Sequence, residues 1–209
     1  MAEIRFRFAK EKDCRLILKF IRSLARYEKM SDEVVATEEI LREWLFEKKK
    51  AEVIFALDGE KEVGFALFFH NFSTFLGRAG IYLEDLYVRP SYRGMGYGKA
   101  LLIKLAQIAV TRGCGRLEWA CLDWNQPSID FYRSLGAVPL DEWTVYRVSG
   151  ETLKEMAGHG GSGAPAEKEG RCGSSAPAEM EGRCGSGAPA EKEGRCGSGA
   201  PVEMTGKDG

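Results

Sequence analysis

Three glycines stand at alternate positions in the stretch Arg93–Lys99, and their spacing favours the binding of an anionic group. Gly94, Gly96 and Gly98 follow a predicted strand directly and open a predicted helix. Glycine has no Cβ, so the backbone can come close to a ligand at these positions. The N–H groups at the start of a helix point toward such an anion. The stretch therefore predicts a turn that holds a phosphate or pyrophosphate.

Two other interpretations of these glycines have to be weighed. A glycine-rich turn can serve only to redirect the chain, with no ligand at all. A dinucleotide site of the Rossmann type needs the glycines after the first strand, with an acidic residue about 20 residues further on. Here they come after the fourth predicted strand and are preceded by Val88-Arg89-Pro90. This order does not fit a dinucleotide-binding unit, so a phosphate site of another kind is favoured.

The elements that would position this turn form a mixed α/β pattern, with hairpin strands first and strand–helix alternation second. Apolar runs of four to eight residues predict strands, and apolar residues at three-to-four spacing predict helices. Asp58-Gly59 is a hairpin signal between two of the strands. The predicted strands are Ile4–Phe8, Val53–Leu57, Glu62–Phe69, Ile81–Val88, Arg116–Leu122 and Trp143–Val148. The predicted helices are Glu11–Met30, Thr37–Phe46, Gly98–Arg112, Pro127–Leu135 and Glu151–Met156.

The composition of the 209-residue chain changes near residue 158. Residues 1–157 contain every Trp, Tyr and Phe. After them comes a twelve-residue repeat of the type GSGAPAEKEGRC, with copies that begin at Gly161, Gly173 and Gly185 and a decayed fourth copy from Gly197. Such repeats have no apolar face to bury against a neighbour. We therefore expect one domain at residues 1–157 and a disordered tail at residues 158–209.

Charge and cysteine content argue against several classes of protein. The chain has 30 Lys and Arg against 31 Asp and Glu, scattered rather than gathered in a stripe, so we expect no nucleic-acid partner. There is no run of 18 apolar residues and no apolar stretch after a basic N-terminus, so we expect neither a membrane span nor a signal peptide. The six cysteines lack the paired spacings of zinc sites or disulfide frameworks. We expect a cytoplasmic protein with reduced thiols and no metal.

Two motifs resemble the acetyl-CoA signatures of GNAT-superfamily N-acetyltransferases. The first is Val88–Gly98, which reads VRPSYRGMGYG, and the second is Asn125–Tyr132, which reads NQPSIDFY. Shorter strings resemble the spermidine/spermine (diamine) N-acetyltransferase branch: Asp13-Cys14, Tyr27-Glu28, Tyr82–Asp85 and Leu122–Gln126. Within that branch, the string LDWNQ is most similar to the thialysine N-ε-acetyltransferases. The resemblance spans residues 3–157, and the repeats have no counterpart in it.

This resemblance implies a fold, a co-substrate and a set of site residues. The fold is the α/β (mixed α+β) GNAT fold, a central mixed and mostly antiparallel sheet flanked by helices. The co-substrate is acetyl-CoA, the assembly is a homodimer, and Tyr132 is the general acid. The residues implied to contact CoA are Leu86, Tyr87, Val88, Arg93, Gly94, Met95, Gly96, Tyr97, Gly98, Lys99, Asn125, Gln126, Pro127 and Ser128. The residues implied to line the amine site are Tyr27, Glu28, Glu84, Glu118, Trp119, Ala120 and Glu142, with Trp143 as a further candidate.

The chemistry of acetyl transfer supports some of these roles independently. An alkyl ammonium has a pKa of about 10 and must lose a proton before it attacks. Glu84 is placed to take that proton through water, and only one of Glu84 and Asp85 is expected to face the amine because adjacent strand residues point to opposite faces. Tyr132 is suited to donate a proton to the departing thiolate, although its helix also suits a packing role. A backbone N–H is expected to stabilise the carbonyl oxygen as it gains charge.

Three functions remain open at this point. The main hypothesis is an enzyme that transfers acetyl from acetyl-CoA to the primary amine of a small cationic substrate, by direct attack in a ternary complex. Its acceptor would be a thialysine- or lysine-like amino acid, or a polyamine. Asn71–Gly80, interpreted as a loop, has no acidic residue, which weakens the polyamine alternative. The other hypotheses are an acetyl-CoA-binding regulator without turnover and an acetyltransferase that acts on a protein or peptide amine.

Overall fold

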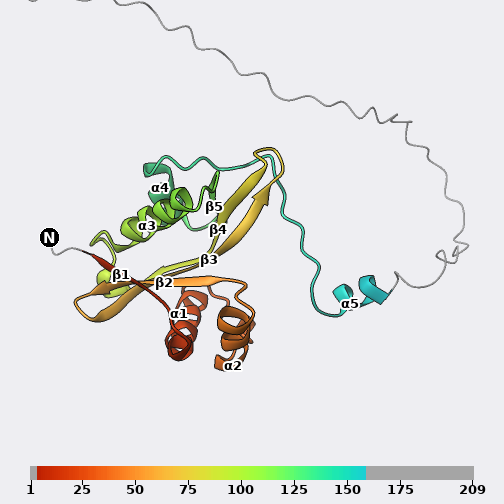
Figure 1. The fold of residues 1–209 in the computed structure, drawn as a ribbon, viewed down its shortest axis with the longest axis horizontal. Helices are drawn as coiled ribbons and strands as arrows, with labels where there is room; N and C mark the ends of the chain where they lie inside the picture. The colour runs from red at the N-terminus through yellow and green to blue at the C-terminus, as the bar shows by residue number, and fades with distance from the viewer. Residues whose placement is uncertain (1–3, 159–209) are drawn as a thin grey trace, which may run out of the picture. The chain divides into compact units, whose positions relative to one another are not determined.

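A mixed β-sheet lies at the centre of the molecule (Figure 1). The computed structural model describes residues 4–158, and the sheet belongs to a compact unit that ends at Trp143. Within that described part the strands follow in the order β1 (Arg5–Phe8), β2 (Glu52–Asp58), β3 (Lys61–Ser73), β4 (Arg78–Val88) and β5 (Leu117–Trp119). Neighbours are antiparallel except for β4 and β5, which are parallel because the chain between them crosses over through a helix. The predicted mixed, mostly antiparallel sheet is confirmed.

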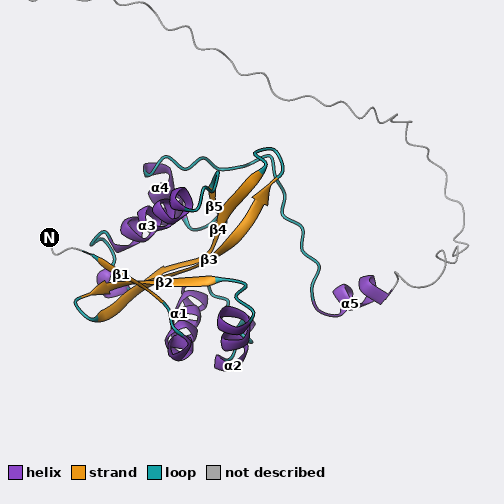
Figure 2. Cartoon of the chain, in the orientation of Figure 1, coloured by secondary structure: helices purple, strands orange, loops and turns teal. Residues whose placement is uncertain are grey.

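Helices cover both faces of this sheet (Figure 2). α1 (Cys14–Tyr27) and α2 (Glu38–Arg42) lie on one face, and α3 (Tyr97–Thr111) and α4 (Gln126–Ser134) lie on the other (Figure 1). Short 3₁₀ turns, Glu11–Asp13 and Ser31–Glu33, flank α1, and a π-helical turn, Glu43–Glu47, continues α2. The Thr37 hydroxyl accepts a hydrogen bond from the Ile40 N–H at 3.3 Å, so Thr37 caps the helix as its position predicts.

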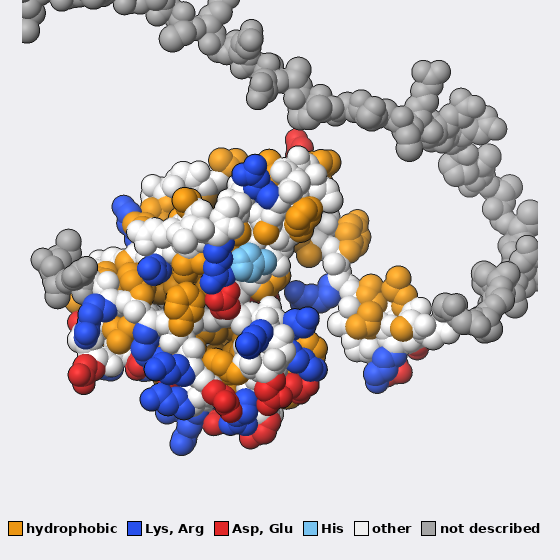
Figure 3. Space-filling model, in the orientation of Figure 1, with side chains coloured by type: hydrophobic (Ala, Val, Ile, Leu, Met, Phe, Trp, Pro, Cys, Tyr) orange, Lys and Arg blue, Asp and Glu red, His pale blue; other side chains and the backbone are white. Residues whose placement is uncertain are grey.

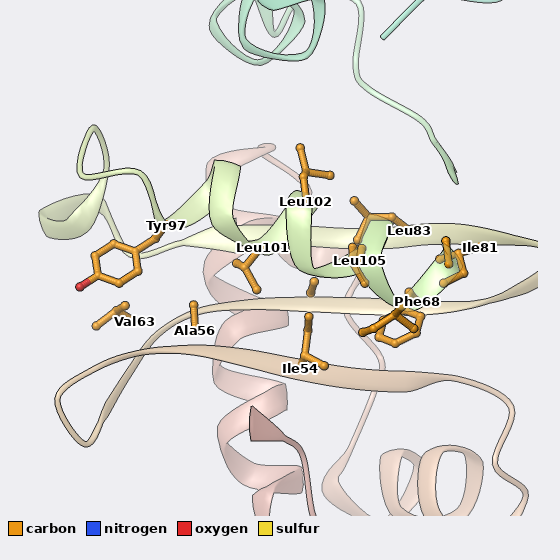
Figure 4. Close-up of a cluster of buried hydrophobic side chains, with 13 residues drawn as sticks. Ile54, Ala56, Val63, Phe68, Ile81, Leu83, Tyr97, Leu101, Leu102 and Leu105 are labelled. Carbon is orange, nitrogen blue, oxygen red and sulfur yellow. The ribbon is translucent and has the colours of Figure 1, made fainter. Parts of the chain in front are cut away.

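Two hydrophobic clusters join the helices to the sheet. The cluster beneath α3 contains apolar residues of β2, β3, β4 and α3, among them Ile54, Phe68, Ile81, Leu101 and Leu105 (Figure 4). The cluster beneath α1 contains apolar residues of β2, β3 and α1, among them Ile17, Phe20, Phe55 and Phe65. Neighbouring strand residues such as Ile54 and Phe55 therefore contribute to opposite clusters, as the pleat of a strand requires.

β4 contains a bulge near its middle. Leu83 pairs with Phe68 of β3, and Asp85 pairs with the adjacent residue, Leu67. Glu84 is therefore an extra residue in β4, because it has no partner in β3 between Phe68 and Leu67. Such a bulge interrupts the ladder and bends the strand that carries it.

The bulge also reverses the alternation of side chains along β4. Leu83 belongs to the cluster beneath α3, and Leu86 packs against the same cluster although the two are an odd number of positions, three, apart in the sequence. Tyr87 belongs to the cluster beneath α1. Glu84, which follows Leu83, and Asp85, which precedes Leu86, thus both lie on the α1 face of the sheet. The expectation that only one of these carboxylates faces that side is wrong, because it assumed an unbroken alternation.

The predicted strand Trp143–Val148 is not a strand in the structure. The segment is irregular, and Trp143, Val145 and Tyr146 are 71%, 84% and 89% exposed. Its apolar residues satisfy the sequence pattern of a strand. A strand also needs a partner for its backbone N–H and C=O groups, and none of the strands in residues 4–158 pairs with this segment.

Two further boundaries differ from those expected. The stretch Asn71–Gly80 is mostly strand rather than loop, since β3 and β4 continue their antiparallel ladder until Ser73 pairs with Arg78. A four-residue turn, residues 74–77, joins the two strands. β5 spans only Leu117–Trp119 and is therefore shorter than its apolar pattern predicts.

The remaining described residues follow the compact unit. α5 (Gly150–Gly158) contains the predicted helix Glu151–Met156. The predicted disordered tail lies outside the described residues, and the domain boundary at residue 157 stays a prediction. Acidic and basic side chains are interspersed on the face shown in Figure 3. No helix within residues 4–158 combines the length and the apolar character needed to span a bilayer.

Candidate active site

The glycine turn leads from the end of β4 into α3. A 3₁₀ turn, Pro90–Tyr92, separates the strand from the glycines. Gly94 and Gly96 have φ angles of +76° and +89°, in the left-handed region that favours glycine. Gly96 is the residue that caps α3, and the N–H groups of the first helical turn have no partner inside the helix. This geometry suits the binding of an anion.

The side chains of the turn divide between solvent and protein. Met95 and Lys99 are exposed and border the turn. Tyr97 instead points into the cluster beneath α3 (Figure 4). Of the predicted CoA contacts in this stretch, the backbone and Lys99 are accessible to a ligand, whereas the Tyr97 side chain is part of the core.

The Arg93 side chain, which is predicted to contact CoA, packs against two tyrosine rings. Its guanidinium carbon is 4.7 Å from the ring centroid of Tyr27 and 5.4 Å from that of Tyr87. Its Nε donates a hydrogen bond to the Val88 carbonyl at 3.1 Å. These are cation–π contacts, which hold the guanidinium near the C-terminal end of α1.

Beyond the bulge, β4 has a free edge. β5 pairs with β4 only at Ile81–Leu83, before the bulge. In the described part of the chain, Leu86 and Val88 therefore have a strand neighbour only on the β3 side. The two strands diverge next to the glycine turn, which leaves a row of backbone groups accessible to a ligand.

The register shows which backbone groups face this edge. The Arg89 N–H donates to the Val63 carbonyl of β3 at 2.9 Å. Alternate residues of an antiparallel strand direct both backbone groups to the same neighbour, so Tyr87 is also directed to β3. Leu86 and Val88 are directed the other way, toward the free edge. Among the three residues predicted to present backbone groups, Leu86 and Val88 are therefore directed to the free edge and Tyr87 is not, although the Val88 carbonyl already accepts a hydrogen bond from Arg93 Nε.

Three carboxylates come together on the α1 face. Glu84 and Asp85 belong to the β4 bulge, and Glu28 follows the last residue of α1. Burial, followed by the negative charges of Glu84 and Glu28, raises the pKa of Asp85 to about 7. Burial also raises the pKa of Glu28. A carboxylate with a pKa near neutrality is suited to accept and release a proton at physiological pH.

Tyr132 lies on α4, packs against the cluster beneath α3 and is close enough to Glu28 to be influenced by its charge. Its ring contacts Trp119 of β5, with 5.0 Å between centroids. Burial, followed by the negative charges of Cys121 and Glu28, raises the pKa of Tyr132 to about 12. The phenol therefore keeps its proton at neutral pH and can act as a donor.

A hydrogen bond connects α1 to α4 across the site. The Tyr27 hydroxyl donates to Oδ1 of Asn125 at 3.0 Å. Asn125 is buried, and its backbone carbonyl accepts hydrogen bonds from the N–H groups of Ser128 and Ile129 at the start of α4. Asn125 thus serves as a structural junction, and its side-chain oxygen is already used by Tyr27.

Residues 15–137 match the acetyltransferase (GNAT) family. The chain is a member of the GNAT family. The match covers strands β2 to β5, the glycine turn and α4, which are the parts that form the site described above. The predicted GNAT fold and the predicted N-acetyltransferase activity are confirmed.

Individual relatives agree with this assignment. The GNAT chain is 44% identical over 170 residues to the thialysine N-ε-acetyltransferase of Bos taurus, which covers 76% of this chain and 99% of the relative. It is 33% identical over 168 residues to the human spermidine/spermine N(1)-acetyltransferase-like protein 1, with 75% of this chain and 24% of the relative covered. Among solved structures, an integron cassette protein from V. cholerae matches with a TM-score of 0.64 and 30% identity, covering 75% of this chain and 99% of that one. The predicted resemblance to thialysine N-ε-acetyltransferases is confirmed.

The other residues predicted to line the amine site of this GNAT domain are dispersed. Glu118 forms an ion pair with Arg116 at 2.8 Å and accepts a hydrogen bond from Asn71 at 2.6 Å. Trp119 contacts Tyr132, and Ala120 is exposed just after β5. Glu142 is exposed in the irregular segment after α4. Only Tyr27, Glu28 and Glu84 of the predicted set lie at the carboxylate cluster.

The predicted CoA contacts at the start of α4 are mostly on its surface. Gln126 donates to Asp130 one helical turn later at 2.6 Å, so its side chain lies along the helix. Pro127 occupies the first turn, where it needs no N–H partner. Ser128 is half-buried beside it. This end of α4 is accessible, but Asn125 faces inward.

Two residues that sequence reasoning assigned no role lie at the site. Asp85 has the strongly raised pKa, first because it is buried and then because Glu84 and Glu28 are negatively charged nearby; the bulge places it on the same side as Glu84. Cys121 is half-buried, and its pKa is raised by burial and then by Glu28 and Asp123. The string Glu84-Asp85 was the available signal for Asp85, but a bulge leaves no mark in the sequence. Nothing in the sequence pattern pointed to Cys121.

Proposed function

We propose that this GNAT protein transfers an acetyl group from acetyl-CoA to the primary amine of a small cationic substrate. The observation that carries the proposal is the free edge of β4, which lies between the glycine turn and the carboxylate cluster. The turn is suited to a phosphate group and the cluster to an ammonium group. A donor and an acceptor bound at these places would meet at Leu86–Val88.

The donor half of the site would be made mainly of backbone. The first N–H groups of α3, supplemented by Lys99, would bind the pyrophosphate. The backbone groups of Leu86 and the N–H of Val88, which face the free edge, would pair with the amide groups of the pantetheine arm. One of their N–H groups would also stabilise the thioester oxygen as negative charge develops on it. No metal is needed for these steps.

The side chains around the amine would first take a proton from the ammonium and later give one to the departing CoA thiolate. The ammonium would give its proton to the Glu84–Asp85 pair, through water in the case of the exposed Glu84. The neutral nitrogen would attack the acetyl carbon, and the C–S bond would break. Tyr132 would donate its proton to the departing thiolate, which completes the transfer without a covalent enzyme intermediate. Attack in a ternary complex follows from this arrangement.

The carboxylate cluster favours a cationic acceptor of small size. The relatives named for thialysine support an amine on an amino-acid side chain. A polyamine is the second candidate, supported by the relative named for spermidine and spermine. The hairpin turn at residues 74–77 offers no acidic residue for a second ammonium, so we favour the lysine-like amine.

Thiol release from acetyl-CoA across a panel of amines tests the proposal. Spermidine, lysine and thialysine are compared in parallel, with the Tyr132→Phe variant as the internal control. Amine-dependent thiol release by the wild type, much reduced in the variant, is the expected result. Binding of acetyl-CoA with no amine-dependent release would instead favour the regulator hypothesis.

Two finer properties belong to the proposal as well. A reducing, cytoplasmic location is supported by Cys14, Cys114 and Cys121, which are free thiols in the described part of the chain. The homodimer rests on the resemblance to the family alone. Sedimentation of the purified full chain would test it, and a single monomeric species would contradict it.

A further inference from the structure

The first residues of β3 hold the 3₁₀ turn that precedes the glycines. The Arg89 N–H donates to the Val63 carbonyl at 2.9 Å, and Arg89 Nε donates to the Glu62 carbonyl at 3.0 Å. The Lys61 ammonium donates to the Tyr92 hydroxyl at 3.1 Å and lies 5.2 Å from the centre of the Tyr92 ring. Both ends of the turn are therefore attached to β3.

Tyr97 attaches the other end of the glycine turn to the same hairpin. It directly follows Gly96, and its ring is only 8% exposed beside Val63 (Figure 4). The ring meets that of Tyr92 edge to face, with 6.0 Å between centroids. Burial, followed by the influence of the Asp58 carboxylate, raises the pKa of Tyr97. Gly94 and Gly96 are thus flanked in the sequence by two tyrosines, Tyr92 and Tyr97, and each tyrosine contacts the β2–β3 hairpin.

Such attachments matter because a glycine-rich segment has many accessible conformations. Fixing the backbone of one residue costs about 1–2 kcal/mol of conformational entropy. A segment that is already held in its bound conformation avoids this cost when the ligand arrives. Gly94 and Gly96 are the residues with the most freedom to lose.

We propose that Lys61 and Tyr97 are positioning residues for the pyrophosphate-binding turn. Their side chains act through Tyr92 and through the start of α3 and do not themselves contact the donor. The inference rests on the proposed function, since it takes acetyl-CoA as the ligand of the turn. According to this inference, the β2–β3 hairpin contributes to the affinity for acetyl-CoA although it carries none of the proposed catalytic residues.

A comparison of two acetyl donors distinguishes this positioning role from a general role in protein stability. Acetyl-CoA and S-acetylpantetheine carry the same thioester, but S-acetylpantetheine lacks the pyrophosphate and the nucleotide. The variants Lys61→Met and Tyr97→Phe are made in the full chain, because each keeps most of the side chain and removes the polar group. We expect the KM for acetyl-CoA to rise about fivefold in Lys61→Met, which corresponds to the loss of one hydrogen bond, and to rise in Tyr97→Phe as well. The KM for S-acetylpantetheine and kcat with either donor should stay unchanged.

Equilibrium binding of CoA and of pantetheine gives the same comparison without turnover. The matched controls are Lys50→Met and Tyr146→Phe, whose side chains are exposed and should leave CoA binding at the wild-type level. Variants that bind CoA as tightly as the wild type, or that lose CoA and pantetheine equally, would overturn the positioning role. Wild-type protein that binds CoA but transfers no acetyl group would overturn the proposed function and leave the positioning role intact. Lys61→Met removes only an exposed ammonium, so this variant tests the inference even if Tyr97→Phe unfolds.

Discussion

The hydroxyl of Tyr27 donates a hydrogen bond to the side-chain oxygen of Asn125 at 3.0 Å, across a sequence separation of 98 residues. This bond joins the end of α1 to the start of α4. Glu28 follows Tyr27 directly, and Tyr132 lies two turns after Asn125 on α4. The negative charge of Glu28 contributes to the raised pKa of Tyr132. A single junction between two distant segments therefore helps to place both residues.

Removal of the Tyr27 hydroxyl should weaken this junction. Tyr27→Phe leaves the buried Asn125 oxygen without its partner, which costs about 1–3 kcal/mol. Denaturant unfolding should show the loss of stability, together with a higher KM for the amine. Tyr146→Phe is the matched control, because that tyrosine is 89% exposed. An unchanged unfolding midpoint in Tyr27→Phe would show that the junction contributes nothing.

The pKa of Asp85 predicts a pH dependence of the reaction. With a pKa of about 7, the Asp85 carboxyl is protonated at lower pH and cannot accept a proton. The value of kcat/KM should therefore fall as the pH drops below about 7. Asp85→Asn should lower kcat/KM by about 10²-fold or more and remove this acid limb. The exposed Asp141→Asn is the control, and an acid limb that persists in Asp85→Asn would exclude Asp85 as the base.

The neighbour of Asp85 should shift that acid limb. The negative charge of Glu84 contributes to the raised pKa of Asp85. Glu84→Gln removes the charge, so the acid limb should move to lower pH. A pH–rate profile of the variant measures the shift. Movement to higher pH would contradict the proximity of the two carboxylates.

Protein stability should depend on Asp85 with a definite sign. Its pKa is about 7 in the folded protein, against 3.8 for an unperturbed aspartate side chain. Between these values the folded state binds more protons than the unfolded state, so this residue makes stability fall as the pH rises from about 4 to about 7. In Asp85→Asn that contribution disappears. Urea unfolding of both proteins at several pH values should show the variant gaining stability over the wild type toward pH 7, and a constant difference would contradict the assignment.

Tyr132→Phe should separate proton donation from packing. The phenyl ring keeps the contact with Trp119, so CoA binding and the unfolding temperature should change little. Loss of the donor should lower kcat by about 10²-fold or more. Steady-state kinetics and a thermal melt, measured on the same preparation, distinguish proton donation from packing. A wild-type kcat in the variant would assign Tyr132 to packing alone.

A Cβ at Gly96 should damage the phosphate turn through backbone conformation. At φ +89° no neighbour would meet the Cβ, so the cost of Gly96→Ala is the left-handed conformation itself, about 1–2 kcal/mol. CoA affinity should fall as the turn and the start of α3 relax. Gly158→Ala is the control, since that glycine also has open space but no positive φ. Equal CoA affinities for the two variants would contradict the proposed role of the turn.

Local patterns predicted much of this molecule. The spacing of apolar residues gave the positions of α1, α3 and four of the strands, because side-chain periodicity is a property of each element by itself. The apolar pattern at Trp143–Val148 resembles those of the confirmed strands, yet this segment is not a strand in the structure. Its periodicity is local, whereas the hydrogen-bonding partner that a strand requires lies elsewhere in the chain.

The site shows the same division between local and distant causes. The amino-acid sequence by itself determined the glycine turn and its place before a helix, since these depend on residue type and on near neighbours. The general acid candidate, Tyr132, came from the resemblance of its motif to the family. The tertiary structure alone decided that Glu84 and Asp85 share a face, that Arg93 lies on Tyr27, and that Asn125 faces inward. Each of these depends on pairing between segments distant in sequence. A bulge arises from the register of two strands, and that register is set only when both are packed between the helices.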